Sequence, residues 1–247
     1  MLNLRNTVQR FFGAFGYEVK RKPRNVYERR GKVLLRLISE RGINLLLDVG
    51  ANQGQYSRGL RALGFQGRIA SFEPVKATFA KLKTAIADSQ NWQAHAFALG
   101  DTDAETVISI GGNPECSSLL PMGDLHVEAY PESAPCGEEK ISVRRLDTLA
   151  SDFVTPKDRI FLKLDVQGYE LKALQGAVRT LAQVELIDIE LSLVPLYDGQ
   201  PLFVEVVRFL EEAGFVPVSL ENGFINPRNG HALQVDGIFV RESKNAS

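Results

Sequence analysis

The chain has 247 residues, 44% of them hydrophobic and 24% charged, with a formal net charge of −1 at pH 7. This globular composition supports one substantial core, in a large single domain or a domain with an arm. No run approaches the roughly 18 apolar residues of a membrane span, and two cysteines, Cys116 and Cys136, are too few for a disulfide scaffold. Without a signal-peptide pattern or a metal-type Cys/His cluster, we expect a cytoplasmic protein with free thiols.

Taken in order, the chain begins with two helical patterns. Apolar residues recur at helical spacing over residues 2–15 and again over 26–41, where the pattern stops at Gly42. Strands then alternate with helices, with strands expected at 45–49, 68–72 and 92–97 and helices at 55–63 and 76–87. This alternation predicts right-handed βαβ units and a parallel sheet, and therefore an α/β domain.

The alternation breaks after the third strand. Two strand patterns, 106–110 and 140–144, flank a loop-like insertion at residues 111–139 that is rich in Gly, Pro and Ser. Loops this long inside compact domains are often functional lids. We predict that the insertion closes over the site and that Ser117 and Ser118 contact the substrate.

The alternation then resumes and ends in two adjacent strands. Strands are expected at 160–164, 184–191, 215–220 and 237–241, and helices at 169–181 and 202–213. No helix separates the last two strands, so we predict an antiparallel pair at one edge of the sheet. The chain thus divides into a helical extension at residues 1–41 and an α/β domain at 42–247.

The net charge hides an asymmetry between these two parts. Residues 1–41 carry eleven Lys or Arg and three Glu, a charge of +8, which leaves −9 for residues 42–247. A basic arm of this kind contacts anionic lipid, nucleic acid or an acidic neighbouring subunit in some proteins, and is a solvated helical lead-in in others. We prefer the lead-in, and the few aromatic residues near the basic cluster give base stacking little support.

The stretch around which the domain is organised is the turn Asp48-Val49-Gly50-Ala51-Asn52-Gln53-Gly54. It joins a buried strand to a helix start, where glycines permit close approach of a ligand and free N–H groups favour an anion. It is not the dinucleotide fingerprint, because Asn52 stands where the second glycine belongs. An acid before the first glycine suits a ligand with an amine, a carboxylate and a sulfonium, which is the charge pattern of S-adenosylmethionine. The alternative is an ordinary strand-to-helix turn that binds nothing.

Acidic residues stand at or just beyond most of the predicted strand ends, where open α/β sheets bind ligands. They are Asp48, Glu73, Asp101, Asp165, Glu190 and Asp236. Glu73 is placed to take both ribose hydroxyls of a nucleotide. Asp101 is placed to reach an adenine amine, unless it only forms a turn after Gly100.

Three of these carboxylates, Asp165, Glu190 and Asp236, are candidates for work on a second substrate. Asp165 either orients a substrate hydroxyl, acts as a base, binds a cation or caps the following helix. Together the three offer the oxygen ligands that Mg²⁺ takes. We favour hydrogen-bonded cleft residues over a metal site.

The chain has three histidines, and for a lone histidine a packed structural role is the common case. His95 falls in a predicted strand and His126 in the insertion. His231 lies in a polar loop before Asp236, which makes it the best placed of the three to act as a general base.

Six short segments occur in this order along the chain, at a characteristic spacing. They are Asp48-Val49-Gly50-Ala51-Asn52-Gln53-Gly54, Phe72-Glu73-Pro74, Ser117-Ser118-Leu119, Leu146-Asp147-Thr148-Leu149, Leu162-Lys163-Leu164-Asp165-Val166-Gln167-Gly168-Tyr169-Glu170 and Leu174-Gln175-Gly176-Ala177. With the closing part from Glu190 to Phe239, they resemble the FkbM family of S-adenosylmethionine-dependent methyltransferases. The resemblance spans residues 42–241 and leaves residues 1–41 outside it.

The resemblance implies a seven-stranded, mostly parallel Rossmann-like sheet with the last strand antiparallel and helices on both faces. It also implies methyl transfer, usually to a hydroxyl oxygen. The turn after the first strand would hold the methionine end of the cofactor, Glu73 the ribose, and residues 98–101 the adenine. The predicted cofactor contacts are Asp48, Gly50, Asn52, Gly54, Tyr56, Glu73, Pro74, Ala98, Leu99, Asp101 and Asp165.

One position departs from the family pattern. Many members read Asp-x-Glu-Gly where this chain reads Asp165-Val166-Gln167-Gly168. Gln167 cannot be a base, so any role for a carboxylate there passes to Asp165 or Glu170.

The predicted function is S-adenosylmethionine-dependent methylation of a hydroxyl on a sugar, glycan or other small natural-product acceptor. We assign Asp165 or His231 as the base and Glu190 as the residue that orients the acceptor. The predicted catalytic residues are Asp165, Glu190 and His231, and the predicted acceptor contacts are Ser117, Ser118, Glu190 and Asp236.

Other interpretations stay open. A nicotinamide-dependent oxidoreductase is disfavoured by the missing G-x-G-x-x-G motif. A non-catalytic, cofactor-binding assembly partner would use the arm and the insertion for contacts, and a homo-oligomer is compatible with either role. An RNA methyltransferase would need the basic arm, because the domain at −9 lacks the charge that RNA binding requires.

Overall fold

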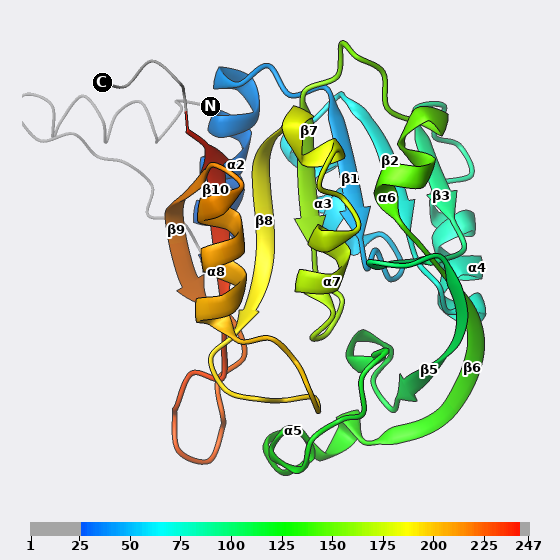
Figure 1. The fold of residues 1–247 in the computed structure, drawn as a ribbon, viewed down its shortest axis with the longest axis vertical. Helices are drawn as coiled ribbons and strands as arrows, with labels where there is room; N and C mark the ends of the chain where they lie inside the picture. Colours follow the sequence, from blue (N-terminus) through cyan, green and yellow to red (C-terminus); the bar gives the residue numbers. More distant parts are fainter. Residues whose placement is uncertain (1–25, 243–247) are drawn as a thin grey trace, which may run out of the picture.

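The computed structural model describes residues 26–242, and within them seven strands form one sheet (Figure 1). Along the sheet the strands are β3 (Trp92–His95), β2 (Arg68–Phe72), β1 (Leu45–Val49), β7 (Ile160–Leu164), β8 (Val184–Ser192), β10 (Gln234–Arg241) and β9 (Phe215–Asn222). Neighbours from β3 to β8 are parallel, while β10 runs antiparallel to both β8 and β9. The predicted α/β class, with an antiparallel final strand and the last two strands paired at one edge, is confirmed.

The central strands β1 and β7 are buried over their whole length. Their near-continuous apolar sequences suit this position, because helices cover both faces of a parallel sheet. The two strands pair in register, with Asp48 opposite Lys163 and Val49 opposite Leu164. This register brings the turn after β1 to the same level as the turn after β7.

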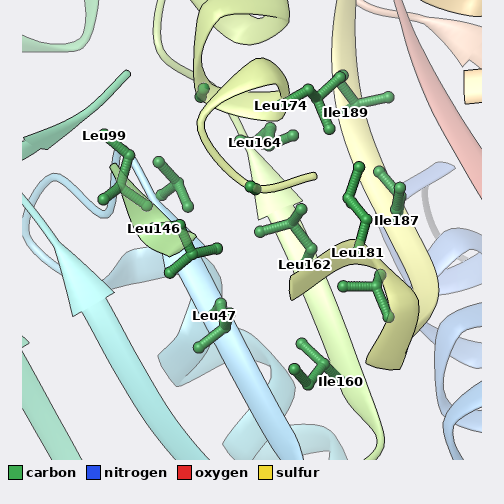
Figure 2. Close-up of a cluster of buried hydrophobic side chains, with 14 of the residues drawn as sticks. Leu47, Leu99, Leu146, Ile160, Leu162, Leu164, Leu174, Leu181, Ile187 and Ile189 are labelled. Atoms are coloured by element: carbon green, nitrogen blue, oxygen red, sulfur yellow. The ribbon is translucent and has the colours of Figure 1, made fainter. Parts of the chain in front are cut away.

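Helices cover the two faces of this sheet. On one face lie α2 (Val26–Glu40), α3 (Gln55–Leu63) and α4 (Lys76–Ala85), and on the other α6 (Leu146–Leu149), α7 (Glu170–Gln175) and α8 (Phe203–Glu212). Side chains alternate between the faces with the strand period of two. Leu46 faces the first group, whereas Leu45 and Leu47 face the second. Figure 2 shows the second cluster, in which strand residues such as Leu162 and Ile187 pack against Leu174 and Leu181.

Helix α2 packs as part of the domain. Leu34, Leu37 and Ile38 are buried in the same cluster as Leu46 and Phe161 of the sheet. The boundary drawn from the sequence after residue 41 therefore does not coincide with a break in packing. The helix expected over residues 2–15 and the basic residues before residue 26 lie outside the described residues.

A second, three-stranded sheet has the order β4-β6-β5 and consists of β4 (Ala98–Leu99), β6 (Pro135–Arg144) and β5 (Ala104–Gly111). The strand expected over 92–97 therefore ends at His95, and the next residues join this other sheet. The insertion between β5 and β6 is more ordered than a loop. It contains η1 (Pro114–Cys116), α5 (Asp124–Ala129) and η2 (Pro131–Ser133), and Figure 1 shows α5 on the side toward which the main strands point.

The helix expected over 169–181 is interrupted. Helix α7 ends at Gln175, and the 3₁₀ turns η3 (Ala150–Asp152) and η4 (Thr180–Gln183) complete this layer. A Cβ at Gly176 would lie 1.8 Å from the carbonyl oxygen of Gly100, so the backbone packs closely against the loop after β4 at this point. Across residues 26–242, no helix has the length and apolar character that crossing a bilayer requires.

Candidate functional site

A pocket of about 670 Å³ opens at the carboxyl ends of β1, β2 and β7, between the sheet and the insertion. This volume is in the range of small-molecule and cofactor sites. Ten of the residues singled out from the sequence line it: Gly50, Asn52, Tyr56, Glu73, Pro74, Ala98, Leu99, Ser117, Asp165 and Glu190. The others, Asp48, Gly54, Asp101, Ser118, Asp236 and His231, do not.

The turn after β1 is shaped by the neighbouring turn after β7. Gly50 has φ 74°, and a Cβ there would lie 1.8 Å from the carbonyl oxygen of Asp165. Gly50 and Ala51 both donate their N–H groups to the carbonyl of Phe72, at 3.1 and 3.0 Å. Only glycine allows this approach, so the turn leaves its backbone bare at the pocket.

Asn52 and Glu73 meet on the pocket wall. The backbone N–H of Asn52 donates to Glu73 Oε2 at 3.0 Å, and that of Val75 donates to Oε1 at 2.9 Å. Burial raises the pKa of Glu73 to about 7, against the opposing effect of these two N–H groups. The side-chain Oδ1 of Asn52 is buried and has no hydrogen-bond partner among the described residues. The wall therefore presents acceptor atoms with capacity for the hydroxyl and amine hydrogens of a ligand.

Asp48 supports this turn from behind. It is fully buried, accepts a hydrogen bond from Ser57 Oγ at 2.6 Å, and lies 3.7 Å from the ammonium of Lys163. Lys163 also donates to the carbonyl of Gly50 at 3.1 Å. Burial raises the pKa of the Asp48 carboxyl. The sequence suggested a direct cofactor contact for Asp48, but its side chain is directed into the protein, where it fixes Lys163 and the turn.

Lys163 was not singled out from the sequence, although a lysine in the apolar run Ile160–Leu164 is a signal. Its Nζ lies 3.5 Å from Asp165 Oδ2 as well as near Asp48. Burial disfavours its charge, but the two carboxylates outweigh that effect and raise its pKa above the usual value. Lys163 is therefore a buried cation held between two acids at the base of the pocket.

A second buried ion pair lies next to it. Arg30 of α2 pairs with Asp188 of β8, and the Tyr56 hydroxyl donates to the other oxygen of Asp188 at 2.6 Å. Arg30 and Tyr56 both line the pocket. Helix α2 thus contributes to the wall of the site. The sequence did not predict this, because α2 lies outside the part of the chain that resembles the family.

Gln167 connects two carboxylates of the pocket lining, those of Asp165 and Glu190. Its Nε2 donates to Asp165 Oδ1 at 2.8 Å and to Glu190 Oε2 at 3.0 Å, while its Oε1 accepts from the Tyr197 hydroxyl at 2.8 Å. The backbone of Gln167 is left-handed, with φ 54°. Such strain in a non-glycine residue persists where surrounding contacts determine it, which is common at functional sites.

Glu190 is held by amides. Gln167 and Gln234 both donate to its Oε2, the second at 2.6 Å, and no described residue hydrogen-bonds its Oε1. Burial raises the pKa of Glu190 well above its ordinary value, and the nearby charge of Asp165 adds to the rise. Both effects favour the protonated form of this carboxyl.

The insertion forms the opposite wall. Ser117 lines the pocket, while Ser118 is buried and donates to the carbonyl of Gln167 at 2.7 Å. His126 of α5 also lines the pocket, with its ring 5.2 Å from that of Tyr197, and burial lowers its pKa. The insertion is therefore joined directly to the turn after β7, and it brings a neutral histidine to the site.

Three predicted residues lie elsewhere. His231 is exposed in the hairpin between β9 and β10, where its carbonyl accepts from Asn226 N at 2.8 Å. Asp101 pairs with Lys172 at 2.7 Å. Asp236 lies within β10 opposite Glu190, and burial raises its pKa to about 6. None of the three lines the pocket.

Two of the carboxylates that the sequence offered as Mg²⁺ ligands are engaged by amides. The amides of Gln167 and Gln234 already donate to the carboxylate oxygens of Asp165 and Glu190. These N–H groups compete with a cation for one oxygen of each carboxylate. Over residues 26–242, no group of three or more His, Cys, Asp or Glu side chains is arranged to hold a metal.

Comparison with known proteins finds similar chains that are named as methyltransferases or methylases. A protein named Methyltransferase 1 from Beauveria bassiana (strain ARSEF 2860) is 25% identical over 183 residues, covering 70% of this chain and 72% of that protein. Similar solved structures include precorrin-6y C5,15-methyltransferase from Geobacter metallireducens GS-15 (14% identity, 91% and 94% of the two chains, TM-score 0.45). Another is an rRNA methylase from Streptococcus thermophilus (10% identity, 90% and 100%, TM-score 0.48). These structural likenesses are too distant to bear on the activity.

The family model described as "Methyltransferase FkbM domain" matches residues 48–217, from Asp48 in β1 to Pro217 in β9. This range contains the turn after β1, the insertion and the turn after β7, which together form the pocket. The chain therefore belongs to the FkbM family of methyltransferases.

Proposed function

We propose that this chain binds S-adenosylmethionine in the pocket and methylates a hydroxyl oxygen of a small acceptor held between Glu190 and the insertion. The observation that carries the proposal is the position of Glu190. A carboxyl with a raised pKa shares one pocket with the bare turn of Gly50 and with Glu73. Transfer to a hydroxyl requires a bound methyl donor and, beside it, a group in position to take the hydroxyl proton.

The cradle fits the proposed cofactor. The bare backbone at Gly50, the unpartnered Oδ1 of Asn52 and the buried Glu73 line one side of the pocket. Glu73 already accepts two backbone hydrogen bonds, but a carboxylate has lone pairs left for ribose hydroxyls. When bound, S-adenosylmethionine supplies a methyl group that its sulfonium has already activated.

The two acceptor-side carboxylates have different surroundings. Asp165 lies 3.5 Å from the ammonium of Lys163, which stabilises its negative charge. Glu190 has only amide donors and a raised pKa. We therefore assign Glu190 as the base that takes the hydroxyl proton at its Oε1, and Asp165 as the charged residue that orients the donor side.

The insertion supports alignment and the exclusion of water. Ser118 ties it to the carbonyl of Gln167, and the bridge from Met122 to Tyr197 ties it to the loop after β8. Holding two reactants in line in a dry pocket provides much of the rate advantage when the donor is already activated. The proposed lid role of residues 111–139 follows from this placement.

The experiment is an acceptor screen that measures release of S-adenosylhomocysteine, with the linkage of the methylated product determined by NMR. Sugars and glycosides are the first acceptors to test. Glu190→Gln keeps the hydrogen-bonding shape and should reduce turnover by about 10²–10⁴-fold. Glu185→Gln on the same strand, where Glu185 pairs with Arg41 and Arg159 away from the pocket, is the matched control. Methyl transfer to nitrogen or carbon, or full activity of Glu190→Gln, would contradict the proposal.

A further inference from the structure

The cations of the pocket are both neutralised by buried partners. Among the described residues that line it, the only Lys or Arg side chains are Arg30 and Lys163. Arg30 pairs with Asp188, and Lys163 lies within 4 Å of Asp48 and Asp165. Displacing either cation toward a ligand would leave a buried carboxylate unpaired, which is costly. Among residues 26–242, the pocket thus has no Lys or Arg side chain free to pair with an anionic group of the acceptor.

The acids of the pocket are less fully neutralised. Glu115 of the insertion is exposed at the wall and accepts a hydrogen bond from Gln55 at 2.9 Å, with no ion-pair partner among the described residues. Asp165 remains 41% exposed despite its contact with Lys163. An entering ligand therefore meets carboxyl groups on both walls.

The insertion that supplies Glu115 to the pocket wall is acidic throughout. Residues 111–139 contain six acidic residues and no Lys or Arg. One of the six, Glu139, lies 3.9 Å from Lys76, while Glu115, Asp124, Glu128, Glu132 and Glu138 are exposed. A cleft lined by one sign of charge concentrates ligands of the opposite sign and repels those of the same sign.

The remaining wall is apolar and offers one unpartnered polar side chain. Leu119, Tyr130 and Phe224 line the pocket beside His126. His126 is 3% exposed, and its Nδ1 is buried with no hydrogen-bond partner among residues 26–242. A buried polar atom without a partner, in a pocket wall, indicates a place where a ligand completes the site.

We propose that the acceptor is a hydroxyl compound that carries no anionic group, and that a protonated amine beside its apolar part improves its binding. This inference rests on the proposed function and narrows its substrate class. Phosphorylated sugars, sugar acids and RNA are excluded as acceptors, while amino sugars and other hydroxylated amines fit. Within residues 26–242, the acidic insertion also disfavours RNA as the acceptor.

The test uses three probes of one shape and different charge: tyramine, tyrosol and 4-hydroxyphenylacetate. Each is titrated into the full chain saturated with S-adenosylhomocysteine, and its dissociation constant is measured by saturation-transfer NMR at low and high salt. Tyramine should bind about tenfold or more tightly than 4-hydroxyphenylacetate, with tyrosol between them. The difference should shrink at high salt because exposed charges are screened.

Two variants test whether the charge of Glu115 at the pocket wall causes the preference for tyramine. Glu115→Gln at the pocket wall should reduce the preference for tyramine about twofold or more. Glu132→Gln, an equal charge change in η2 outside the pocket lining, should leave the preference closer to that of the unmodified chain.

The outcomes separate this inference from the proposed function. Equal or tighter binding of 4-hydroxyphenylacetate, displacement of tyramine by RNA, or failure of all three probes to bind beside S-adenosylhomocysteine would overturn the inference alone. Failure of S-adenosylhomocysteine itself to bind would overturn the proposed function and the inference with it.

Discussion

The side-chain amide of Gln167 donates a hydrogen bond to Glu190 Oε2 at 3.0 Å and, with its other hydrogen, to Asp165 Oδ1 at 2.8 Å. One neutral amide therefore lies between two carboxylates that would otherwise repel each other. The Tyr197 hydroxyl fixes the amide by donating to its oxygen. The residue that departs from the family pattern is thus the residue that sets the environment of the proposed base.

Gln167→Glu tests this relationship. The substitution removes both amide donors and adds a third acidic group, which should raise the pKa of Glu190 further. We expect the rising limb of the pH–rate profile to move to higher pH and turnover at pH 7 to fall at least tenfold. Gln167→Met, which removes the donors without adding charge, is the control and should shift the profile less. Superimposable profiles for Gln167→Glu and the unmodified chain would contradict the account.

Parallel substitution of His126 and His231 tests whether the base assigned from the sequence, His231, or the histidine in the pocket, His126, contributes to the reaction. His126 lines the pocket, whereas His231 is exposed in the β9–β10 hairpin. His126→Gln should raise the KM for the acceptor severalfold, because the ring forms part of the acceptor wall. His231→Gln should leave KM and kcat unchanged. Steady-state kinetics decide between them, and a large loss of kcat in His231→Gln alone would restore His231 as the base.

Lys163 should be a major contributor to stability. Lys163→Met leaves the fully buried Asp48 without its cation, a change that typically costs 3–5 kcal/mol. For a domain of this size we expect Tm to fall by about 10 °C in a thermal melt. Lys172→Met breaks the more exposed pair with Asp101, where the cost should be about 1 kcal/mol or less.

A second substitution tests whether the unpaired charge of Asp48 causes the loss of stability in Lys163→Met. Asp48→Asn in the Lys163→Met background removes the unpaired charge and should recover part of the lost Tm. Equal melting temperatures for Lys163→Met and Lys172→Met would contradict the prediction that the buried pair of Lys163 and Asp48 stabilises the fold more than the exposed pair of Lys172 and Asp101.

Glu170 gives the fold a pH dependence of definite sign. It is buried, accepts hydrogen bonds from the N–H groups of Val166 and Gly168, and burial raises its pKa from 4.5 to about 7. The folded chain therefore holds a proton that the unfolded chain releases. Glu170 therefore makes its whole contribution to the free energy of unfolding below about pH 4.5, and this contribution is lost as the pH rises to about 7.

Glu170→Gln keeps an oxygen acceptor for both N–H groups and removes the ionisation. Its Tm should match that of the unmodified chain near pH 5 and exceed it by several degrees at pH 8, equivalent to about 3 kcal/mol at most. Parallel Tm–pH curves for the two proteins would count against the buried carboxyl as the cause. Glu212→Gln at the exposed end of α8 is the matched control for loss of one charge.

The sequence predicted those features that depend on local pattern. The strand–turn–helix with Gly50 and Asn52, and the acid Glu73 at the next strand end, follow from residues close together in the chain. The α/β class follows from the alternation of strands and helices. These local signals predicted residues that line one wall of the pocket, without knowledge of strand order.

The rest depends on contacts between distant residues. Lys163 reaches Asp48 only because β1 and β7 pair in one register, and Arg30 reaches Asp188 only because α2 packs on the sheet. From the sequence, His231 is the best placed histidine, but the paths of the β9–β10 hairpin and of the insertion bring His126 to the pocket instead. The bridging role of Gln167 likewise needed the position of β8.

The measurement that tests the central claim most directly is calorimetric titration of the full chain with S-adenosylmethionine and S-adenosylhomocysteine, with NAD as the control ligand. The account predicts micromolar binding of the first two, no binding of NAD, and at least a tenfold loss of affinity in Glu73→Ala, which removes the proposed ribose contact. Absence of binding by both sulfur ligands, or affinity that Glu73→Ala leaves unchanged, would contradict it.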